Sequence, residues 1–347
     1  MRNPILHLKD QSVRATRKAA RKLAAKAVAV GANPAWFQYR VIEKEPLADF
    51  CARRKGDPRV SCEIFHHFET TSNPLPINVR DPAELPDDRG WWGYSFRDVP
   101  QRRSGQTFLA TLPDCRVVPR VDEKGDFWVT ILNDENRSLV IREMALRREH
   151  RDVLQRSPVE TIEEGVWMLE RVYDNYSHWL TAHLPKLLLL RSLGLSDKII
   201  LPLKRPRFID DCLRLYDFDP ERFQTFDPSK VLRVKRLTTL DTDRFRPDLL
   251  RLVRDACPVF ERRSVGRRVF ISRKGATRRR LLNEDELWPL LEMRGFERLR
   301  MEELSFSEQV ALMQETETLC APHGAGLTNM MFCSPGTQVI EMADLSF

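Results

Sequence analysis

Residues 320–342, CAPHGAGLTNMMFCSPGTQVIEM, decide how the rest of the chain is interpreted. Residues 318–321 have the pattern of a short apolar strand, which Pro322 and Gly324 end. Residues 325–332 have the spacing of a short helix, and residues 338–342 have the pattern of the next strand. The stretch therefore predicts a strand, a glycine turn, a helix and a second strand in succession.

The glycine turn has the features of an anion site. A helix that starts after such a turn presents free backbone N–H groups and the positive end of its dipole. Gly324 and Gly326 flank Ala325 and let the backbone approach a phosphate closely, while His323 can donate a ring N–H. Glu341 stands near the end of the next strand, where nucleotide-binding α/β folds place an acid on ribose hydroxyls. These residues predict a nucleotide-diphosphate site; the alternative is an ordinary capping turn with a surface histidine and an exposed acid.

Three stretches of the chain resemble glycosyltransferase family 61. They are HGAGLTN at 323–329, NYSHWLTAHLPKLLLL at 175–190 and ISRKGATRRRLLNEDEL at 271–287, in the order and spacing of that family. No stretch before residue 160 offers a matching motif. The resemblance implies an inverting, metal-independent transferase with the two-domain GT-B architecture and a nucleotide-sugar donor, for which a UDP-sugar is the first choice.

The pattern of the chain changes near its middle. Residues 35–160 carry short apolar runs between proline, glycine and charged clusters, which indicates strands and loops, with a hairpin around Gly125. From residue 161 helical and strand patterns alternate, which is typical of parallel α/β units. With the resemblance, we expect an α/β, GT-B-like fold of two Rossmann-like domains facing a cleft. The expected parts are a basic N-terminal helix (1–34), a β-containing acceptor-side domain (35–250) and a nucleotide-sugar domain (251–347).

Arginines after the first strand of the second domain are candidate donor ligands. Inverting transfer needs a base for the acceptor proton and cationic or N–H donors for the diphosphate leaving group. Arg273 is predicted at the carboxyl end of its strand, where a guanidinium can hold two phosphate oxygens. Arg278 falls on the position of the family's second arginine, and the alternative for both is a solvated basic loop. Asn283 is predicted to cap the next helix.

The catalytic base stays open at this point. His178 opens an apolar helical segment and is predicted to orient or deprotonate an acceptor hydroxyl, or else to serve as a structural donor. Many members of the family have an acid four residues later, where this chain has Ala182 followed by His183. The base is therefore His178, His183 or an acid elsewhere.

We expect no metal or other cofactor. The sequence DTD at 241–243 resembles the DxD motif of metal-dependent transferases, but it precedes a helix pattern, so we expect Asp241 and Asp243 to cap that helix. An aromatic cluster suits either a sugar platform or packing; it consists of Trp91, Trp92, Tyr94 and Phe96.

Composition limits the class of protein. The chain has 347 residues, of which 42% are hydrophobic, enough for two cores. Its net charge of +7 favours acidic partners such as a sugar nucleotide, an acidic glycan or anionic lipid. Seven cysteines without a CxxC pair indicate a reduced, cytoplasmic setting. No window reaches the ~18 apolar residues of a membrane span. Residues 12–30 form a basic helix that either lies on the inner face of a membrane or is solvated.

The sequence predicts a glycosyltransferase that moves a sugar to a glycan or lipid-linked glycan acceptor in surface or capsular polysaccharide synthesis. One alternative is a catalytically silent scaffold of a transferase complex. Ala182 favours it, and so does the end of the chain five residues after Met342, where members of the family continue through a further strand and helix. The other alternative is a basic nucleic-acid-binding protein, although no zinc-finger, helix-turn-helix or RNA-binding signature is present. The oligomeric state stays open.

Overall fold

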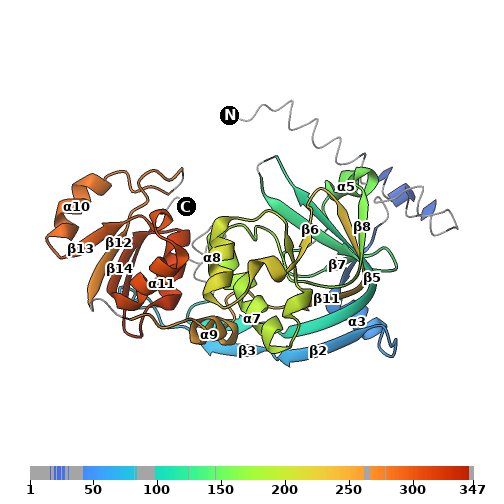
Figure 1. The fold of residues 1–347 in the computed structure, drawn as a ribbon, viewed down its shortest axis with the longest axis horizontal. Helices are drawn as coiled ribbons and strands as arrows, with labels where there is room; N and C mark the ends of the chain where they lie inside the picture. The colour runs from blue at the N-terminus through green and yellow to red at the C-terminus, as the bar shows by residue number, and fades with distance from the viewer. Residues whose placement is uncertain are drawn as a thin grey trace.

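A computed structural model describes residues 42–81, 83, 98–261 and 266–343 except 124, 145 and 278, with isolated residues between 16 and 30. The chain forms two lobes, the first at the right and the second at the left of Figure 1. Several predictions fall outside the described residues. They concern most of the N-terminal helix, the aromatic cluster of Trp91, Trp92, Tyr94 and Phe96, and Arg278.

A mixed seven-stranded sheet forms the first lobe (Figure 1). Its order is β1-β7-β6-β5-β11-β8, and β2 also pairs with β5. The 15-residue β5 runs antiparallel to β2, β6 and β11, so this part of the lobe differs from the Rossmann-like domain expected from the resemblance. The strands are β1 (Lys44–Pro46), β2 (Ser61–His66), β5 (Thr107–Val121), β6 (Phe127–Leu132), β7 (Ser138–Val140), β8 (Val159–Trp167) and β11 (Val231–Asp241).

Smaller elements complete this half of the chain. The predicted hairpin joins β5 to β6, and Gly125 takes the positive φ of 84° that its turn requires. β3 (Glu69–Ser72) and β4 (Gln101–Ser104) form a separate antiparallel pair. Two short helices, α3 (Leu47–Arg53) and α5 (His150–Arg156), belong to the same lobe.

A parallel unit is attached to the edge of this sheet. β8 pairs in parallel with β11, and a bridge between Val166 and Ile199 joins the end of β8 to β9 (Ile200–Pro202). β9 in turn pairs in parallel with β10 (Gln224–Phe226). The spatial order is therefore β10-β9-β8-β11, with the reversal of strand order between β8 and β11. The helices α7 (Leu184–Ser192) and α8 (Arg207–Leu215) connect these strands.

The second lobe has the parallel α/β organisation that the sequence predicts. Its sheet order is β13-β12-β14-β15, with every pair parallel. The helices α10 (Glu284–Glu292) and α11 (Phe306–Glu315) lie on opposite sides of it (Figure 1), as right-handed crossovers in opposite directions require. The strands are β12 (Arg267–Ile271), β13 (Phe296–Leu299), β14 (Thr316–Pro322) and β15 (Gln338–Met342). Between β14 and β15 lies the 3₁₀ helix η7 (Ala325–Phe332). The preceding α9 (Pro247–Asp255) packs on the first lobe, because its Leu249 joins Leu189 of α7 and Leu240 of β11.

The segment 176–192 bends where its sequence demands. The helical segment predicted to open at His178 is not one regular helix, because it consists of α6 (Tyr176–His178), a π turn (Trp179–His183) and α7. Pro185 in the first turn of α7 has no N–H, so the carbonyl four residues earlier cannot be paired in the usual α pattern. The wider π turn accommodates this loss.

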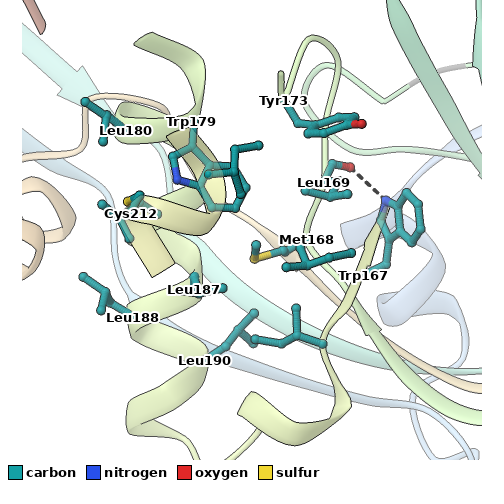
Figure 2. Close-up of a cluster of buried hydrophobic side chains, with 14 of the residues drawn as sticks. Trp167, Met168, Leu169, Tyr173, Trp179, Leu180, Leu187, Leu188, Leu190 and Cys212 are labelled. Carbon is teal, nitrogen blue, oxygen red and sulfur yellow. Dashed lines mark hydrogen bonds between the residues drawn. The ribbon is translucent and has the colours of Figure 1, made fainter. Parts of the chain in front are cut away.

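A buried cluster holds this segment against β8. Figure 2 shows Trp167, Met168 and Leu169 packing against Trp179 and the leucines of α7. Trp167 donates its indole N–H to the Leu169 carbonyl at 2.8 Å. The cluster therefore fixes the connection that leads from β8 to Tyr176.

Candidate functional site

A cleft of about 700 Å³ lies between the lobes. Its second-lobe wall lies at the carboxyl ends of β12 and β14, between which the strand order reverses. Open α/β sheets bind ligands at such a position. The first lobe contributes Tyr176, Arg207, Phe208 and Asp211, and the second contributes, among others, Ile271, Arg273, Phe306, Ala325 and Gly326.

Arg273 and the glycine turn meet in this cleft. A Cβ built on Gly324 would collide with the Arg273 guanidinium, which lies over it, and Arg273 Nε donates to the Arg279 carbonyl at 3.1 Å. The φ of Gly324 is 170°, which any residue adopts, so a side chain is excluded there by the arginine and not by the backbone. A Cβ on Gly326 would lie 3.3 Å from Ile271 Cγ2, so η7 also approaches β12 closely.

His323 and Glu341 lie beside each other, outside the lining of the cleft. His323 Nδ1 pairs with the Glu341 carboxylate, and the His323 backbone N–H donates to the Met342 carbonyl at 2.7 Å. The Glu341 carboxylate, predicted on the ribose, is thus engaged by the imidazole predicted on the diphosphate. The structure brings Arg273, Gly324, Ala325 and Gly326 together, and leaves this pair next to them.

A buried glutamate fastens the loop that carries Arg273. The Ser272 hydroxyl donates to Glu284 Oε1 at 2.5 Å, and the Lys274 backbone N–H donates to Ser272 Oγ at 3.1 Å. Glu284 is only 4% exposed. Asn283 occupies the N-cap position of α10, but its side chain makes no capping hydrogen bond, contrary to the prediction. The sequence signal for Glu284 was an acid in the first turn of the helix after the arginine loop.

Arg244 organises the first-lobe motif. Its guanidinium donates to the Thr181 hydroxyl at 2.7 Å, to the Ser177 hydroxyl at 3.1 Å and to His178 Nε2 at 3.0 Å. Burial, with the charges of Arg244 and Arg171 acting in the same direction, lowers the pKa of His178 to about 4. Because a guanidinium cannot accept a hydrogen bond, the Nε2 lone pair is occupied and cannot take a proton from an acceptor. Sequence reasoning missed Arg244, which lies 66 residues from His178.

His183 has a structural role. Its ring is fully buried, its Nδ1 donates to the His178 carbonyl and its Nε2 accepts from the Glu170 backbone N–H, both at 3.1 Å. Burial lowers its pKa well below the ordinary value. With both ring nitrogens paired to backbone and no exposed surface, the ring does not reach an acceptor hydroxyl. The prediction of His183 as a base therefore does not fit its surroundings.

The capping prediction for the DTD sequence is wrong. Asp241 is the last residue of β11, so the sequence lies at the end of a strand. Asp243 accepts from the Gly105 backbone N–H and pairs with Arg142, whereas α9 begins at Pro247 without a side-chain cap. Within the described residues, no three His, Cys, Asp or Glu side chains gather as a metal would require.

Residues 176–340 match the family model of glycosyltransferase 61. This region belongs to glycosyltransferase family 61. It starts at Tyr176 in the cleft, contains Arg273 and the glycine turn, and ends in β15. No curated protein sequence matches the chain.

The family 61 region includes β9, β10 and β11 of the first lobe, together with the second lobe. Both walls of the cleft come from it, while the strands β1 to β7 lie outside it. The glycosyltransferase class therefore rests on the part of the chain that builds the cleft. In the part of the chain that the structure describes, no helix has both the length and the apolarity to cross a bilayer.

Proposed function

We propose that this family 61 chain transfers a sugar from a nucleotide-diphosphate donor, with a UDP-sugar as first choice, to a glycan acceptor with inversion and without a metal. The position of the Arg273 guanidinium over the glycine turn, at the reversal of strand order between β12 and β14, carries the proposal. A cation and free backbone donors meet there at the edge of a cleft large enough for a nucleotide.

Arg273, Arg278 and the start of η7 each have a role in the proposal. Arg273 holds two oxygens of the diphosphate, and the backbone N–H groups of Ala325 and Gly326 at the start of η7 donate to it. Arg278, five residues later in the sequence and outside the described residues, is proposed as the second cation. Together they stabilise the negative charge that develops on the leaving group.

The acidic side chains of the cleft are compatible with an anion. Glu302 and Glu303 pair with Arg300 at 2.9 and 2.8 Å. Glu308 belongs to the capping box of α11, where it accepts from the Ser305 backbone N–H at 2.8 Å. These pairings reduce the repulsion that a diphosphate would meet.

The acceptor belongs to the first lobe in this proposal. Each lobe has a parallel unit with a reversal of strand order, which supports a GT-B-like layout with the donor on one lobe and the acceptor on the other. His178, whose ring is held by Arg244, then positions the acceptor, and the base is a carboxylate. The net charge of +7 supports an acidic or lipid-linked surface glycan as acceptor.

Calorimetry with UDP tests the donor site. Wild-type protein is expected to bind UDP, and Arg273→Ala is expected to weaken binding by about 10- to 100-fold, since charge-assisted hydrogen bonds contribute about 1.5–3 kcal/mol. Arg268→Ala is the matched control, because Arg268 lies on β12, the strand that precedes Arg273, but donates to the Arg294 carbonyl at 3.0 Å, away from the cleft. Absence of UDP binding, or an equal loss in both variants, contradicts the proposal.

Measurement of turnover distinguishes an enzyme from a catalytically silent scaffold. Ala182 and the engagement of His178 by Arg244 favour the scaffold. UDP-sugars that raise the unfolding temperature are carried into an assay of UDP release. Release that depends on Arg273 supports the transferase, and binding without release supports the scaffold.

A further inference from the structure

The half-buried Tyr176 and two buried side chains, Gln309 and Asn329, join the two lobes at the wall of the cleft. The Tyr176 hydroxyl of the first lobe lies 2.6 Å from Asn329 Oδ1 and 3.0 Å from Gln309 Oε1, both in the second lobe. Asn329 Nδ2 donates to Gln309 Oε1 at 2.9 Å. Asn329 is fully buried and Gln309 is 7% exposed. The triad of Tyr176, Gln309 and Asn329 is therefore a direct polar connection between the lobes, and its second-lobe members are almost fully buried.

The hydrogen bonds of Gln309 fix the direction of the triad. Gln309 Nε2 donates to the Met301 and Leu304 carbonyls at 2.9 and 3.1 Å, so its Oε1 must face Tyr176 and Asn329. Since Asn329 Nδ2 already donates to that oxygen, Tyr176 is the donor, and its single hydroxyl proton is shared between the two amide oxygens, with the shorter contact to Asn329 Oδ1. Burial raises the pKa of Tyr176, which keeps its hydroxyl protonated.

Apolar contacts surround the ring of Tyr176. The Tyr176 ring lies 5.3 Å from the Phe208 ring in α8 and 6.3 Å from the Phe306 ring in α11, measured between centroids. A phenylalanine at position 176 would keep these contacts and remove only the hydroxyl. The contribution of the hydrogen bonds can therefore be separated from that of packing.

We propose that Tyr176 is a positioning residue that sets the spacing between the donor turn and the first-lobe motif. Asn329 belongs to the same eight-residue helix, η7, as Ala325 and Gly326. Tyr176 belongs to the same three-residue turn, α6, as His178. The triad thus links the element that holds the diphosphate to the element that carries His178. This role of Tyr176 rests on the proposed function, because it assumes a donor at the glycine turn.

The consequence for catalysis is specific. Donor affinity depends on groups within the second lobe, which the loss of one hydroxyl in the first lobe leaves in place. Turnover depends on the distance between groups on different lobes, and a misplacement of about 1 Å can cost about 100-fold in rate. Removing the Tyr176 hydroxyl should therefore separate binding from turnover.

Tyr176→Phe is compared with Tyr216→Phe. Tyr216 also buries its hydroxyl, which donates to the Val253 carbonyl at 3.0 Å, but both residues belong to the first lobe. We expect Tyr176→Phe to bind UDP within about threefold of wild type and to release UDP from the UDP-sugar substrate at least about tenfold more slowly. Tyr216→Phe should leave both quantities near wild type. Equal turnover in the two variants overturns the proposal.

Spin labels measure the lobe spacing without any substrate. Cys62 is exposed on β2 of the first lobe, and Met293, 77% exposed after α10, is replaced by cysteine. Double electron–electron resonance should give a broader or shifted distance distribution in Tyr176→Phe than in Tyr216→Phe. Asn329→Leu, which removes the partner from the other lobe, should reproduce the change. Identical distributions in all variants overturn the proposal.

The two measurements also separate this proposal from the function on which it rests. If wild-type protein binds no UDP, the transferase proposal fails, while the spin-label distances still decide whether the triad sets the lobe spacing. If UDP binds and turns over but the distances and rates of Tyr176→Phe match those of Tyr216→Phe, the transferase stands and the positioning role of Tyr176 fails.

Discussion

Polar residues gather at strand ends in both lobes, but the two groups differ in whether their side chains pair with one another or line a cleft. At the ends of β8 and β11 the side chains are used on one another: Lys186 pairs with Glu170, Arg244 holds His178, and His183 bonds to two backbone groups. At the ends of β12 and β14, Arg273 and the turn of η7 line an open cleft. Similar topology thus yields a buried frame of paired polar side chains in the first lobe and a candidate binding site in the second.

Burial explains the difference. A charge removed from water must be paired, because an isolated buried ion is very costly, and its partner then leaves no capacity for a ligand. A guanidinium at the rim of a cleft keeps part of its hydration and can exchange it for phosphate oxygens. Motif residues of a family can therefore serve the frame, the ligand or the contact between lobes.

The largest effect should come from breaking the buried ion pair of the first lobe. Lys186 and Glu170 side chains are only 1% and 7% exposed, so Lys186→Met should destabilise the fold by about 3–5 kcal/mol by leaving the carboxylate unpaired. Lys230→Met is the control, since its pair with Glu160 is 40% and 41% exposed and should contribute at most about 1 kcal/mol. Urea unfolding measures both, and similar losses would contradict a buried frame.

The next largest effect is expected at the candidate binding site of the second lobe. Gly324→Ala places a methyl group where the Arg273 guanidinium lies, so the arginine must move. The displaced guanidinium loses its hydrogen bonds to the diphosphate, which contribute about 1.5–3 kcal/mol, so the Kd for UDP should rise about tenfold or more. The φ of 170° is open to alanine, so the free energy of unfolding should change little. Unchanged UDP affinity would show that the contact between turn and arginine is not part of the site.

A smaller effect should appear in the pH dependence of stability. The pKa of His183 lies well below 6.5 in the folded protein, so below pH 6.5 the unfolded chain binds a proton that the buried ring does not. Stability is therefore lost as pH falls below 6.5, by up to about 1.4 kcal/mol per pH unit for one histidine. Urea unfolding at pH 7 and pH 5 should show a smaller loss in His183→Gln than in wild type. An equal loss would mean that this ring is accessible to protons in the fold.

The smallest effect is expected from metal removal. Asp243 is held by the Gly105 N–H and Arg142 in the first lobe, whereas the proposed diphosphate site is in the second. EDTA should therefore change the rate of UDP release by less than about twofold, because a Mg²⁺ site would need carboxylates aimed at the phosphates. Strong dependence of the rate on Mn²⁺ would overturn the metal-independent proposal.

Local sequence patterns predicted the second lobe well. The strand at 338–342 has the expected bounds, since an apolar run between breakers defines a short strand. The first lobe was predicted less well because the pairing of β5 with β2, β6 and β11 joins distant segments, which leaves no local signature. The π turn was missed because apolar spacing indicates a helical segment but not its type, which the missing N–H of Pro185 changes locally.

The sequence by itself determined the family 61 region, the alternation of helices and strands after residue 161, and the meeting of an arginine with a glycine turn at strand ends. Only the tertiary structure decided that Arg244 occupies His178, that His183 is enclosed, and that Asn329 binds Tyr176 of the other lobe. The physical reason is that a motif fixes which groups are present, whereas their roles depend on burial and on partners brought from distant parts of the chain.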